Sequence, residues 1–180
     1  MKTLPNHLGG HYNINHIDSG VLKYIKECFD TSSLLDIGCG LGEMKELCDD
    51  LEMSYLGIDG DFTANRKHEQ VLIHDYTEGP SNIDKTFDVA WSTEFVEHVE
   101  EKYVDNFMTD FKKAKFVMVT HAPPGKCGYH HVNCKSAQYW IDVFKKNDFE
   151  FSYPHTELIR KSSTMEKEFV RNNGLFFIHK

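Results

Sequence analysis

A run of glycines directly after an apolar segment constrains this chain more than any other feature. The segment 34–37 reads as a buried strand, and Gly38, Gly40 and Gly42 follow it at alternate positions before a polar stretch that begins at Glu43. Glycine permits positive φ and leaves room for a ligand against the main chain, and the amides that open the next helix face such a ligand. The pattern therefore predicts a strand, a tight turn and a helix around a nucleotide-binding site.

The spacing of these glycines separates two classes of nucleotide-binding turn. A dinucleotide-binding turn has the form Gly-x-Gly-x-x-Gly, whose third glycine would stand where this chain has Glu43. The observed form, Asp-x-Gly-x-Gly-x-Gly from Asp36 to Gly42, resembles the first motif of the class I S-adenosylmethionine-dependent methyltransferases. The resemblance implies that Asp36 lies near the amino-acid end of the cosubstrate, and that the turn at Gly38 and Gly40 passes under its methionine and ribose.

Two further acidic residues follow apolar segments downstream. Asp59 ends the segment 54–58, and Asp75 follows the segment 70–74. A carboxylate at a strand end can accept both hydroxyls of a ribose, so Asp59 is expected in that role. The resemblance places Asp75 beside the adenine amino group. Any one of these acids could simply cap a helix or turn, but three in order after three strands favour one binding site. The residues expected to contact the cosubstrate are Asp36, Gly38, Cys39, Gly40, Asp59, Gly60, Asp75, Tyr76 and Thr93.

Apolar and amphipathic segments alternate along the rest of the chain. Helices are predicted over residues 19–29 and 43–51, and strands over 33–37, 54–58, 71–74, 87–91, 115–120, 148–153 and 174–179, with a charged helical stretch between the last two. Such alternation implies right-handed crossovers and a sheet covered by helices on both faces. We expect a doubly wound, mostly parallel, seven-stranded Rossmann-like α/β fold, whose last strand the resemblance makes antiparallel.

Composition narrows the class of protein. A chain of 180 residues with 40% hydrophobic residues is expected to form one methyltransferase domain over 1–180, with a lid segment and helix over 1–30 and the core over 33–180. The sequence contains no apolar run of about 18 residues, so no membrane span is predicted. Residues 1–7 lack the apolar core of a signal peptide, and a cytoplasmic location is therefore expected. The odd count of five cysteines favours reduced thiols. A formal net charge of -8 disfavours broad attraction to nucleic acid.

A second group of chemically active residues follows the fourth predicted strand. If a helix begins at Glu94, then Glu94, Glu97 and His98 share one face of it, because they are spaced i, i+3 and i+4. The alternative is the solvated face of an amphipathic helix. Prolines and glycines make residues 121–133 a loop after the next strand, and this loop contains His130 and His131. Both groups belong to the same edge of the sheet, which favours a functional interpretation.

Two glutamates with one or two histidines suit a divalent ion such as Mg²⁺, Mn²⁺, Zn²⁺ or Fe²⁺. The pattern Glu-x-x-Glu-His resembles the metal-dependent O-methyltransferases, including the small-RNA 3′-terminal 2′-O-methyltransferases and the quinone-biosynthesis O-methyltransferases. Carried over by position, the resemblance implies the metal ligands Glu94, Glu97, His98 and His131, with His130 as the alternative fourth ligand.

The remaining histidines and cysteines allow other interpretations. Thiolate and imidazole are good zinc ligands, so a small zinc knuckle is a rival to the metal site above, although its spacing matches no usual zinc pattern. Its members would be Cys127, His130, His131 and Cys134. His7, His11 and His16 are expected on the surface or in a lid rather than as ligands. Residues 9–12 are expected to close over the pocket, as N-terminal segments do in the methyltransferase family.

Together these features predict an S-adenosylmethionine-dependent O-methyltransferase. Methyl transfer needs an oxygen aligned with the methyl carbon and a group that removes its proton. A metal that chelates two adjacent hydroxyls would lower the hydroxyl pKa and fix its position, and His130 or His98 is expected to take the proton, because imidazole exchanges protons near neutral pH. The expected acceptor is a diol-bearing sugar, glycan or other small molecule, and an RNA 3′-terminal ribose is the alternative.

Two other classes of protein remain open at this stage. A non-catalytic module could bind the cosubstrate and regulate a partner. A nicotinamide-dependent oxidoreductase would share the fold, but the glycine spacing disfavours it. An N-methyltransferase is disfavoured because the segment 91–94, Trp-Ser-Thr-Glu, stands where an Asn/Asp-Pro-Pro-Tyr/Phe motif would be. No membrane partner is expected, and the sequence does not predict an oligomeric state.

Overall fold

The computed structural model describes residues 4–8, 16–64 and 67–180, and within them a seven-stranded sheet has the order β3-β2-β1-β4-β5-β7-β6. The strands are β1 (Ser33–Ile37), β2 (Ser54–Asp59), β3 (Val71–Ile73), β4 (Phe87–Ser92), β5 (Ala114–Val119), β6 (Phe149–Phe151) and β7 (Leu175–His179). The first five strands pair in parallel, and β7 runs antiparallel to both β5 and β6. The α/β fold with an antiparallel last strand is therefore confirmed.

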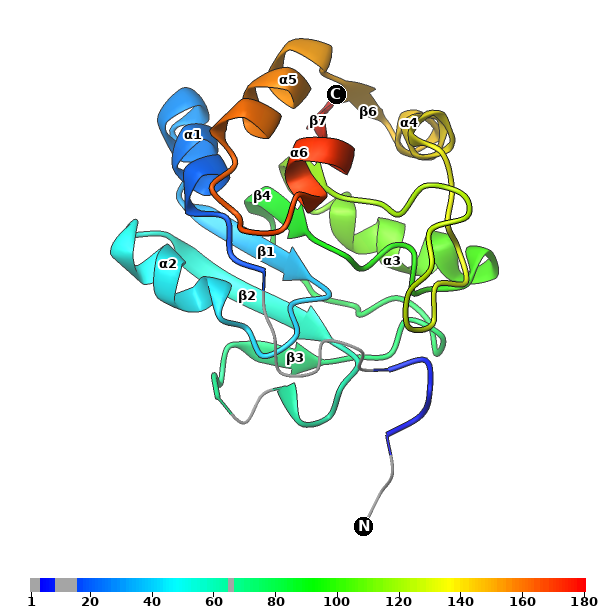
Figure 1. Cartoon of the computed structure of the whole chain (residues 1–180). Helices are drawn as coiled ribbons and strands as arrows, with labels where there is room; N and C mark the ends of the chain where they lie inside the picture. The colour runs from blue at the N-terminus through cyan, green and yellow to red at the C-terminus, as the bar shows by residue number, and fades with distance from the viewer. Residues whose placement is uncertain (1–3, 9–15, 65–66) are drawn as a thin grey trace.

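Helices cover both faces of the sheet (Figure 1). One face carries α1 (Ser19–Phe29), α2 (Met44–Asp50), α5 (Tyr153–Ser162) and α6 (Phe169–Asn173), and the other carries α3 (Val104–Phe111) and α4 (Ala137–Lys146). Successive strand residues point to opposite faces, so Leu35 and Ile37 join the core under α3 while Leu34 joins the core under α1. Because both faces are buried, the central strands carry apolar residues that point to both sides of the sheet. No helix in the described part of the chain has the length and apolar character to cross a membrane.

The start of α1 is fastened to the loop between α5 and α6 by one buried carboxylate. Asp18 caps α1 by accepting the Val21 amide at 3.2 Å. The same carboxylate accepts the Thr164 amide at 2.9 Å and the Ser163 hydroxyl at 2.5 Å. Asp18 is fully buried, so these bonds connect two segments that lie far apart in the sequence.

The helix considered from Glu94 onwards does not form. Residues 94–100 form turns, a short 3-10 helix follows as η2 (Glu101–Tyr103), and α3 begins only at Val104. Glu94 has a φ of 54°, which lies outside the right-handed helical region. A tertiary contact explains the difference, because the Glu94 amide donates to the Thr120 hydroxyl at 2.8 Å.

Two other segments differ from the sequence-based expectation. The helix α4 was not predicted, although Ser136 caps it by accepting the Tyr139 amide and its Trp140 and Phe144 are buried in the core. The charged stretch before β7 is two helices, α5 and α6, and not one. In both places the helix is selected by what its apolar side chains pack against, which a local pattern does not contain.

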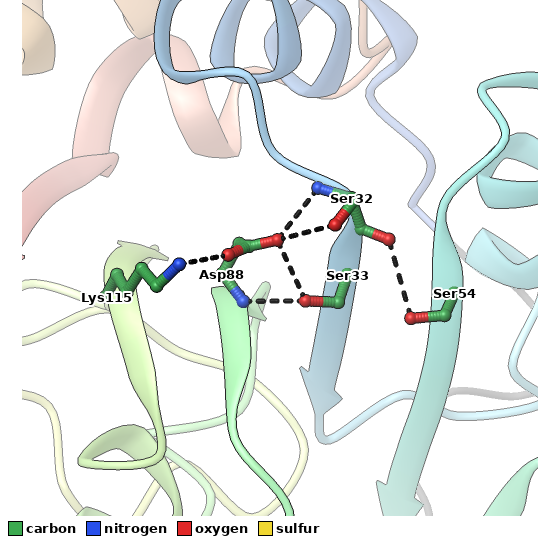
Figure 2. A network of polar contacts seen from close by, with 5 residues as sticks. All are labelled: Ser32, Ser33, Ser54, Asp88 and Lys115. Atoms are coloured by element: carbon green, nitrogen blue, oxygen red, sulfur yellow. Dashed lines mark hydrogen bonds and ion pairs between the residues drawn. The ribbon is translucent and has the colours of Figure 1, made fainter.

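A polar network joins the amino-terminal ends of four strands, as Figure 2 shows. Asp88 at the start of β4 accepts the Ser32 amide at 2.8 Å and the hydroxyls of Ser32 and Ser33 at 3.0 Å each. Its other oxygen pairs with Lys115 of β5 at 2.7 Å, and Ser54 of β2 donates to the Ser32 carbonyl at 3.4 Å. Burial opposes the charge, but these partners hold the pKa of the Asp88 carboxyl well below its usual range.

Replacing Asp88 should therefore destabilise the sheet without touching the opposite edge. We expect Asp88→Ala to lower the free energy of unfolding by about 2–3 kcal/mol, because several charge-assisted hydrogen bonds are lost together. The matched control is Asp84→Ala in the preceding exposed loop, which should change stability by less than about 0.5 kcal/mol. Urea denaturation at pH 7 measures both variants. Equal stability of the two variants would contradict a structural role for the network.

The wild-type advantage should be present above the unfolded-state pKa of aspartate and should fade as the pH falls through the depressed folded-state pKa.

Candidate functional site

A cavity of about 430 Å³ lies at the carboxyl ends of the parallel strands. The strand order reverses between β1 and β4, and Gly38 and Thr93, which follow these two strands, both line the cavity. In open α/β sheets ligands bind at such a reversal point, and a volume of this size suits a small molecule. Every residue that the sequence assigns to cosubstrate contact lines this one cavity: Asp36, Gly38, Cys39, Gly40, Asp59, Gly60, Asp75, Tyr76 and Thr93.

The glycine turn shapes the cavity by omitting side chains. Gly38, Gly40 and Gly42 have φ values of 75°, 54° and 78°, which other residues rarely adopt. A Cβ atom at Gly38 would lie 2.4 Å from the Phe95 ring. No residue larger than glycine fits there without moving Phe95, which belongs to the segment that also carries Glu97 and His98.

The backbone amides of this turn are already bonded within the protein. The amides of Gly38 and Cys39 donate to the Ile58 carbonyl at 2.9 and 3.1 Å, and the Gly40 amide donates to Asp59 Oδ2 at 2.8 Å. These three amides are therefore satisfied by the protein itself. Their bonds instead fasten the turn to the end of β2 and orient the Asp59 carboxylate.

Asp36 is a buried carboxyl beside another carboxyl. The pKa of Asp36 is raised to about 7. Burial raises it most, the Tyr55 hydroxyl, which donates to Asp36 Oδ2 at 3.1 Å, lowers it, and the nearby Asp59 carboxyl raises it by a smaller amount. A cationic group next to these two acids would remove this electrostatic cost. Burial likewise raises the pKa of the Cys39 thiol well above its usual range, so Cys39 acts as a small wall residue and not as a thiolate.

The N-terminal segment lies against the third acid of the cavity. His7 Nε2 is 2.7 Å from Asp75 Oδ2, and a Cβ atom at Gly60 would lie 2.3 Å from Leu8. Burial acts to raise the pKa of Asp75, but hydrogen bonds from His7 and Thr77 outweigh it, and the pKa is lowered. Residues 9–12, expected to form a lid, and His11 lie outside the described residues. Two residues on each side of that gap line the cavity: His7 and Leu8 before it, and His16 and Ile17 after it.

A second group of polar side chains adjoins the cavity. The ligand atoms of Glu97, His98 and His131 lie within 4.8 Å of one another, and the described residues contain no second group of this kind. Glu97 is fully buried next to the Glu94 carboxyl, and neither its carboxylate oxygens nor His98 Nδ1 makes a hydrogen bond of good geometry within residues 4–8, 16–64 and 67–180. Buried polar atoms without partners are rare and costly. A divalent ion would satisfy all of them, and one carboxylate with two imidazoles is a common donor set for such an ion.

Electrostatics distinguish the roles of these residues. Burial, and then the neighbouring Glu94 carboxyl, raise the pKa of Glu97 well above its usual range. Burial, with His131 beside it, lowers the pKa of His98 to about 4. His98 is therefore neutral near pH 7, as a metal ligand must be, and its low pKa makes it a weak general base. The rings of His98 and His131 pack edge to face, with 4.9 Å between their centres.

Two further predicted residues line the cavity without joining this group. Glu94 accepts a hydrogen bond of 3.3 Å from the Thr120 hydroxyl, and burial raises the pKa of its carboxyl. His130 has a φ of 46°, and its ring centre is 6.5 Å from that of His7. The rival zinc knuckle is not assembled in the described residues, although His131 Nδ1 lies 3.7 Å from Cys134 Sγ.

Some cavity residues come from the far end of the chain and were not predicted from the sequence. Lys167 and Phe169 line the cavity, and the Phe169 ring packs edge to face on His16 at 4.8 Å. Nothing in the sequence around residues 165–169 resembles a binding motif. The Asp18 bonds to Ser163 and Thr164 bring this segment to the cavity, so a tertiary contact alone identifies it.

Comparisons with known proteins agree with this geometry. The family model described as a methyltransferase domain matches residues 10–155. A TehB-like S-adenosylmethionine-dependent methyltransferase from Corynebacterium glutamicum is similar in structure, with a TM-score of 0.63, 16% identity, and coverage of 93% of this chain and 90% of that one. Magnesium protoporphyrin IX methyltransferase from Synechocystis, with bound S-adenosylhomocysteine, has a TM-score of 0.62, 14% identity, and coverage of 90% and 81%.

A third similar structure is the methyltransferase domain of a bacterial Hen1 protein, with a TM-score of 0.60, 13% identity, and coverage of 89% of this chain and 96% of that one. No curated protein sequence matches the chain. At these identities the solved structures show a shared fold, and the family match is what assigns the chain.

The buried Asp36 gives a stability prediction with a defined sign. Because the folded-state pKa of Asp36 is raised from 3.8 to about 7, the folded protein binds more protons than the unfolded one between these values. Stability should therefore fall as the pH rises through that range. Asp36→Asn removes this ionisation, and we expect it to be more stable than wild type by about 2–4 kcal/mol at pH 8 and by little at pH 4. Thermal unfolding at both pH values measures the difference. Equal effects at pH 4 and pH 8 would contradict the burial argument.

Proposed function

The chain belongs to the class I S-adenosylmethionine-dependent methyltransferases, and we propose that it methylates a hydroxyl of a sugar, glycan or other diol-bearing small molecule with the help of a divalent metal ion. One observation carries the proposal. Glu97, His98 and His131 bring their ligand atoms within 4.8 Å of one another, and both histidines line the cavity at the strand ends. A methyltransferase that places a metal next to its cosubstrate is suited to hydroxyl acceptors, which are poor nucleophiles without activation.

The residues of the cavity fit the cosubstrate. Asp36 would pair with its ammonium group, Asp59 would accept its ribose hydroxyls, and Asp75 would accept from its adenine amino group. The raised pKa of Asp36 beside Asp59 supports the first role, since a cation removes the cost of the buried charge. Thr93 adds a buried hydroxyl without a partner in the described chain. When bound, S-adenosylmethionine supplies a methyl group activated by its sulfonium.

The second group of residues would hold the metal and the acceptor. Glu97, His98 and His131 are the proposed ligands, and Glu94 is the proposed fourth ligand or acceptor contact, because it lines the same cavity. An ion held there would act as a Lewis acid towards a chelated hydroxyl. Manganese and magnesium suit the carboxylates, and zinc suits the imidazoles.

His130 is the proposed general base. It lines the cavity beside His131 and lies in a loop at the same edge of the sheet. The φ of His130 is positive, which is outside the range of regular strands and helices and is often found at binding and catalytic sites. The pKa of His98, lowered to about 4, makes it a weak proton acceptor, which leaves His130 as the better candidate to accept the proton from the acceptor hydroxyl.

Removing the buried carboxylate should abolish metal binding. We expect Glu97→Ala to weaken Mn²⁺ binding by at least about 100-fold, because it deletes one of three protein ligands. Isothermal titration with Mn²⁺ in the presence of S-adenosylhomocysteine measures this without any knowledge of the acceptor. Glu78→Ala, an exposed residue outside the cavity, is the matched control and should bind Mn²⁺ as the wild type does. Methyl transfer that survives both thorough chelation and Glu97→Ala would refute the metal role.

Replacing the proposed base should affect the chemical step and spare cosubstrate binding. We expect His130→Gln to lower kcat by about 10²–10⁴-fold, as the loss of a general base does, with a comparable affinity for S-adenosylhomocysteine. His155→Gln on α5 is the control, because His155 does not line the cavity. The acceptor for this assay comes from a mass-spectrometric screen of sugars, glycans and RNA ends for the gain of one methyl group. Tight cosubstrate binding with no methylated product in the whole screen would favour a non-catalytic binding module instead.

A further inference from the structure

A second cavity of about 300 Å³ adjoins the first. Its walls come from the loop after β5, residues 121–126, and from the segment 166–173 that contains α6. Glu94, Lys167 and Phe169 line both cavities, so these three side chains form the boundary between them. A molecule that reaches the proposed metal ligands past Glu94 therefore has room for a further group in the second cavity.

The residue at this boundary is held in an unfavourable backbone conformation. Glu94 has a φ of 54°, which glycine adopts easily and glutamate does not. The Thr120 hydroxyl holds Glu94 in this conformation. It accepts a hydrogen bond from the Glu94 amide at 2.8 Å and donates one to the Glu94 carboxyl at 3.3 Å. Backbone strain of this kind is concentrated at binding and catalytic sites. The strained turn places a carboxyl between the two cavities and close to the buried Glu97.

The second cavity carries charges of both signs. Lys126 and Lys167 form no ion pair with any described residue, while the acids of the cavity are Glu94, Glu166 and Glu168. Glu168 is partly compensated by Arg171 at 3.9 Å. An anion would meet the carboxylates and a cation would meet the ammonium groups, so neither is favoured. Hydroxyl groups suit both, because each hydroxyl donates to a carboxylate and accepts from an ammonium group.

Amide and aromatic side chains complete this surface. Asn172 and Asn173 at the end of α6 offer both donors and acceptors. Phe169 presents a ring at the boundary, against which the C–H face of a sugar can pack. A ring face surrounded by mixed polar groups is complementary to a polyhydroxylated ring.

We propose that the second cavity binds the sugar residue next to the one that is methylated, so that the acceptor is a neutral oligosaccharide end and not a free monosaccharide. This inference rests on the proposed O-methyltransferase function and adds the substrate class to it. The reacting diol lies at the metal ligands, and the neighbouring sugar lies across Glu94 among Lys126, Asn172 and Asn173.

The same cavity disfavours an RNA end. The unit next to a terminal ribose in RNA is joined through a negatively charged phosphodiester, which would face three carboxyl groups, those of Glu94, Glu166 and Glu168, against only two lysines. The chain also has a formal net charge of -8. Binding of RNA rewards the opposite charge balance.

A comparison of acceptors of different length tests the inference. The probes are the methyl glycosides of glucose, galactose and mannose, the disaccharides that carry the same sugars at their ends, and an uncharged control alcohol. Methyl transfer is followed by mass spectrometry with Mn²⁺ present. We expect at least one disaccharide to exceed its monosaccharide by about tenfold or more in kcat/KM, which corresponds to one or two additional hydrogen bonds in the second cavity.

Variants confined to the second cavity then locate the preference. Asn173→Ala and Lys126→Met line this cavity and not the first, and each should reduce the disaccharide preference towards one, mainly through a higher KM for the disaccharide. Lys161→Met, an exposed residue of α5, should keep the wild-type preference. Thermal unfolding of each variant confirms that it folds.

The outcomes separate this inference from the proposed function. Monosaccharides and disaccharides methylated with equal kcat/KM, or variants that keep the full preference, would overturn the oligosaccharide assignment alone. A short RNA methylated better than every saccharide would overturn it as well and would assign the second cavity to a phosphodiester. If no hydroxyl acceptor gains a methyl group although Mn²⁺ and S-adenosylhomocysteine bind, the proposed function fails, and the inference fails with it.

Discussion

The attachment of the glycine turn to the end of β2 is the constraint on which the rest of the site depends. Gly38 and Cys39 donate to the Ile58 carbonyl, and Gly40 donates to the Asp59 carboxylate. The turn can follow this path because its glycines adopt positive φ. The missing side chain at Gly38 also admits Phe95, so the same turn positions the segment that leads to the proposed metal ligands. The proposed cosubstrate site and the proposed metal ligands are thereby joined through one contact.

The active edge of the sheet contains interactions that are unfavourable by themselves. Asp36 and Glu97 are buried carboxyls with raised pKa values, and Glu94 and His130 have positive φ. Each such feature reduces the stability of the folded protein, and such features persist only where the surrounding structure holds them in place. Ligands of opposite charge, a cosubstrate ammonium group and a divalent ion, are the natural way to relieve the two buried acids.

The opposite edge of the sheet has the reverse character. At the amino-terminal ends of the strands, the Asp88 carboxylate is bonded to Ser33 of β1, to Ser32 just before it, and to a lysine of β5. Both oxygens of this carboxylate have partners, so the pKa of Asp88 is lowered, whereas the pKa of Asp36 is raised. The sheet is therefore stabilised at one edge and kept chemically available at the other, which is a common division between structural and functional residues.

Local pattern determined much of this protein. The bounds of α1 and β1 follow from apolar periodicity, and the acids Asp36, Asp59 and Asp75 reach one cavity because parallel strands end at the same edge of a sheet. Sequence alone thus predicted the fold class and the family, and the residues that it assigned to cosubstrate contact line one cavity. It could not fix the conformation at Glu94, where a hydrogen bond from another strand overrides a pattern that suits a helix equally well.

Tertiary structure also decided which histidines approach Glu97 and which distant segment lines the cavity. His131 reaches His98 from a loop more than thirty residues away in the sequence, and Phe169 reaches the cavity because Asp18 fastens the preceding loop to α1. Periodicity and motif spacing report contacts between near neighbours in the chain. The polar sites of this molecule arise from packing between distant ones, and only the folded arrangement contains that information.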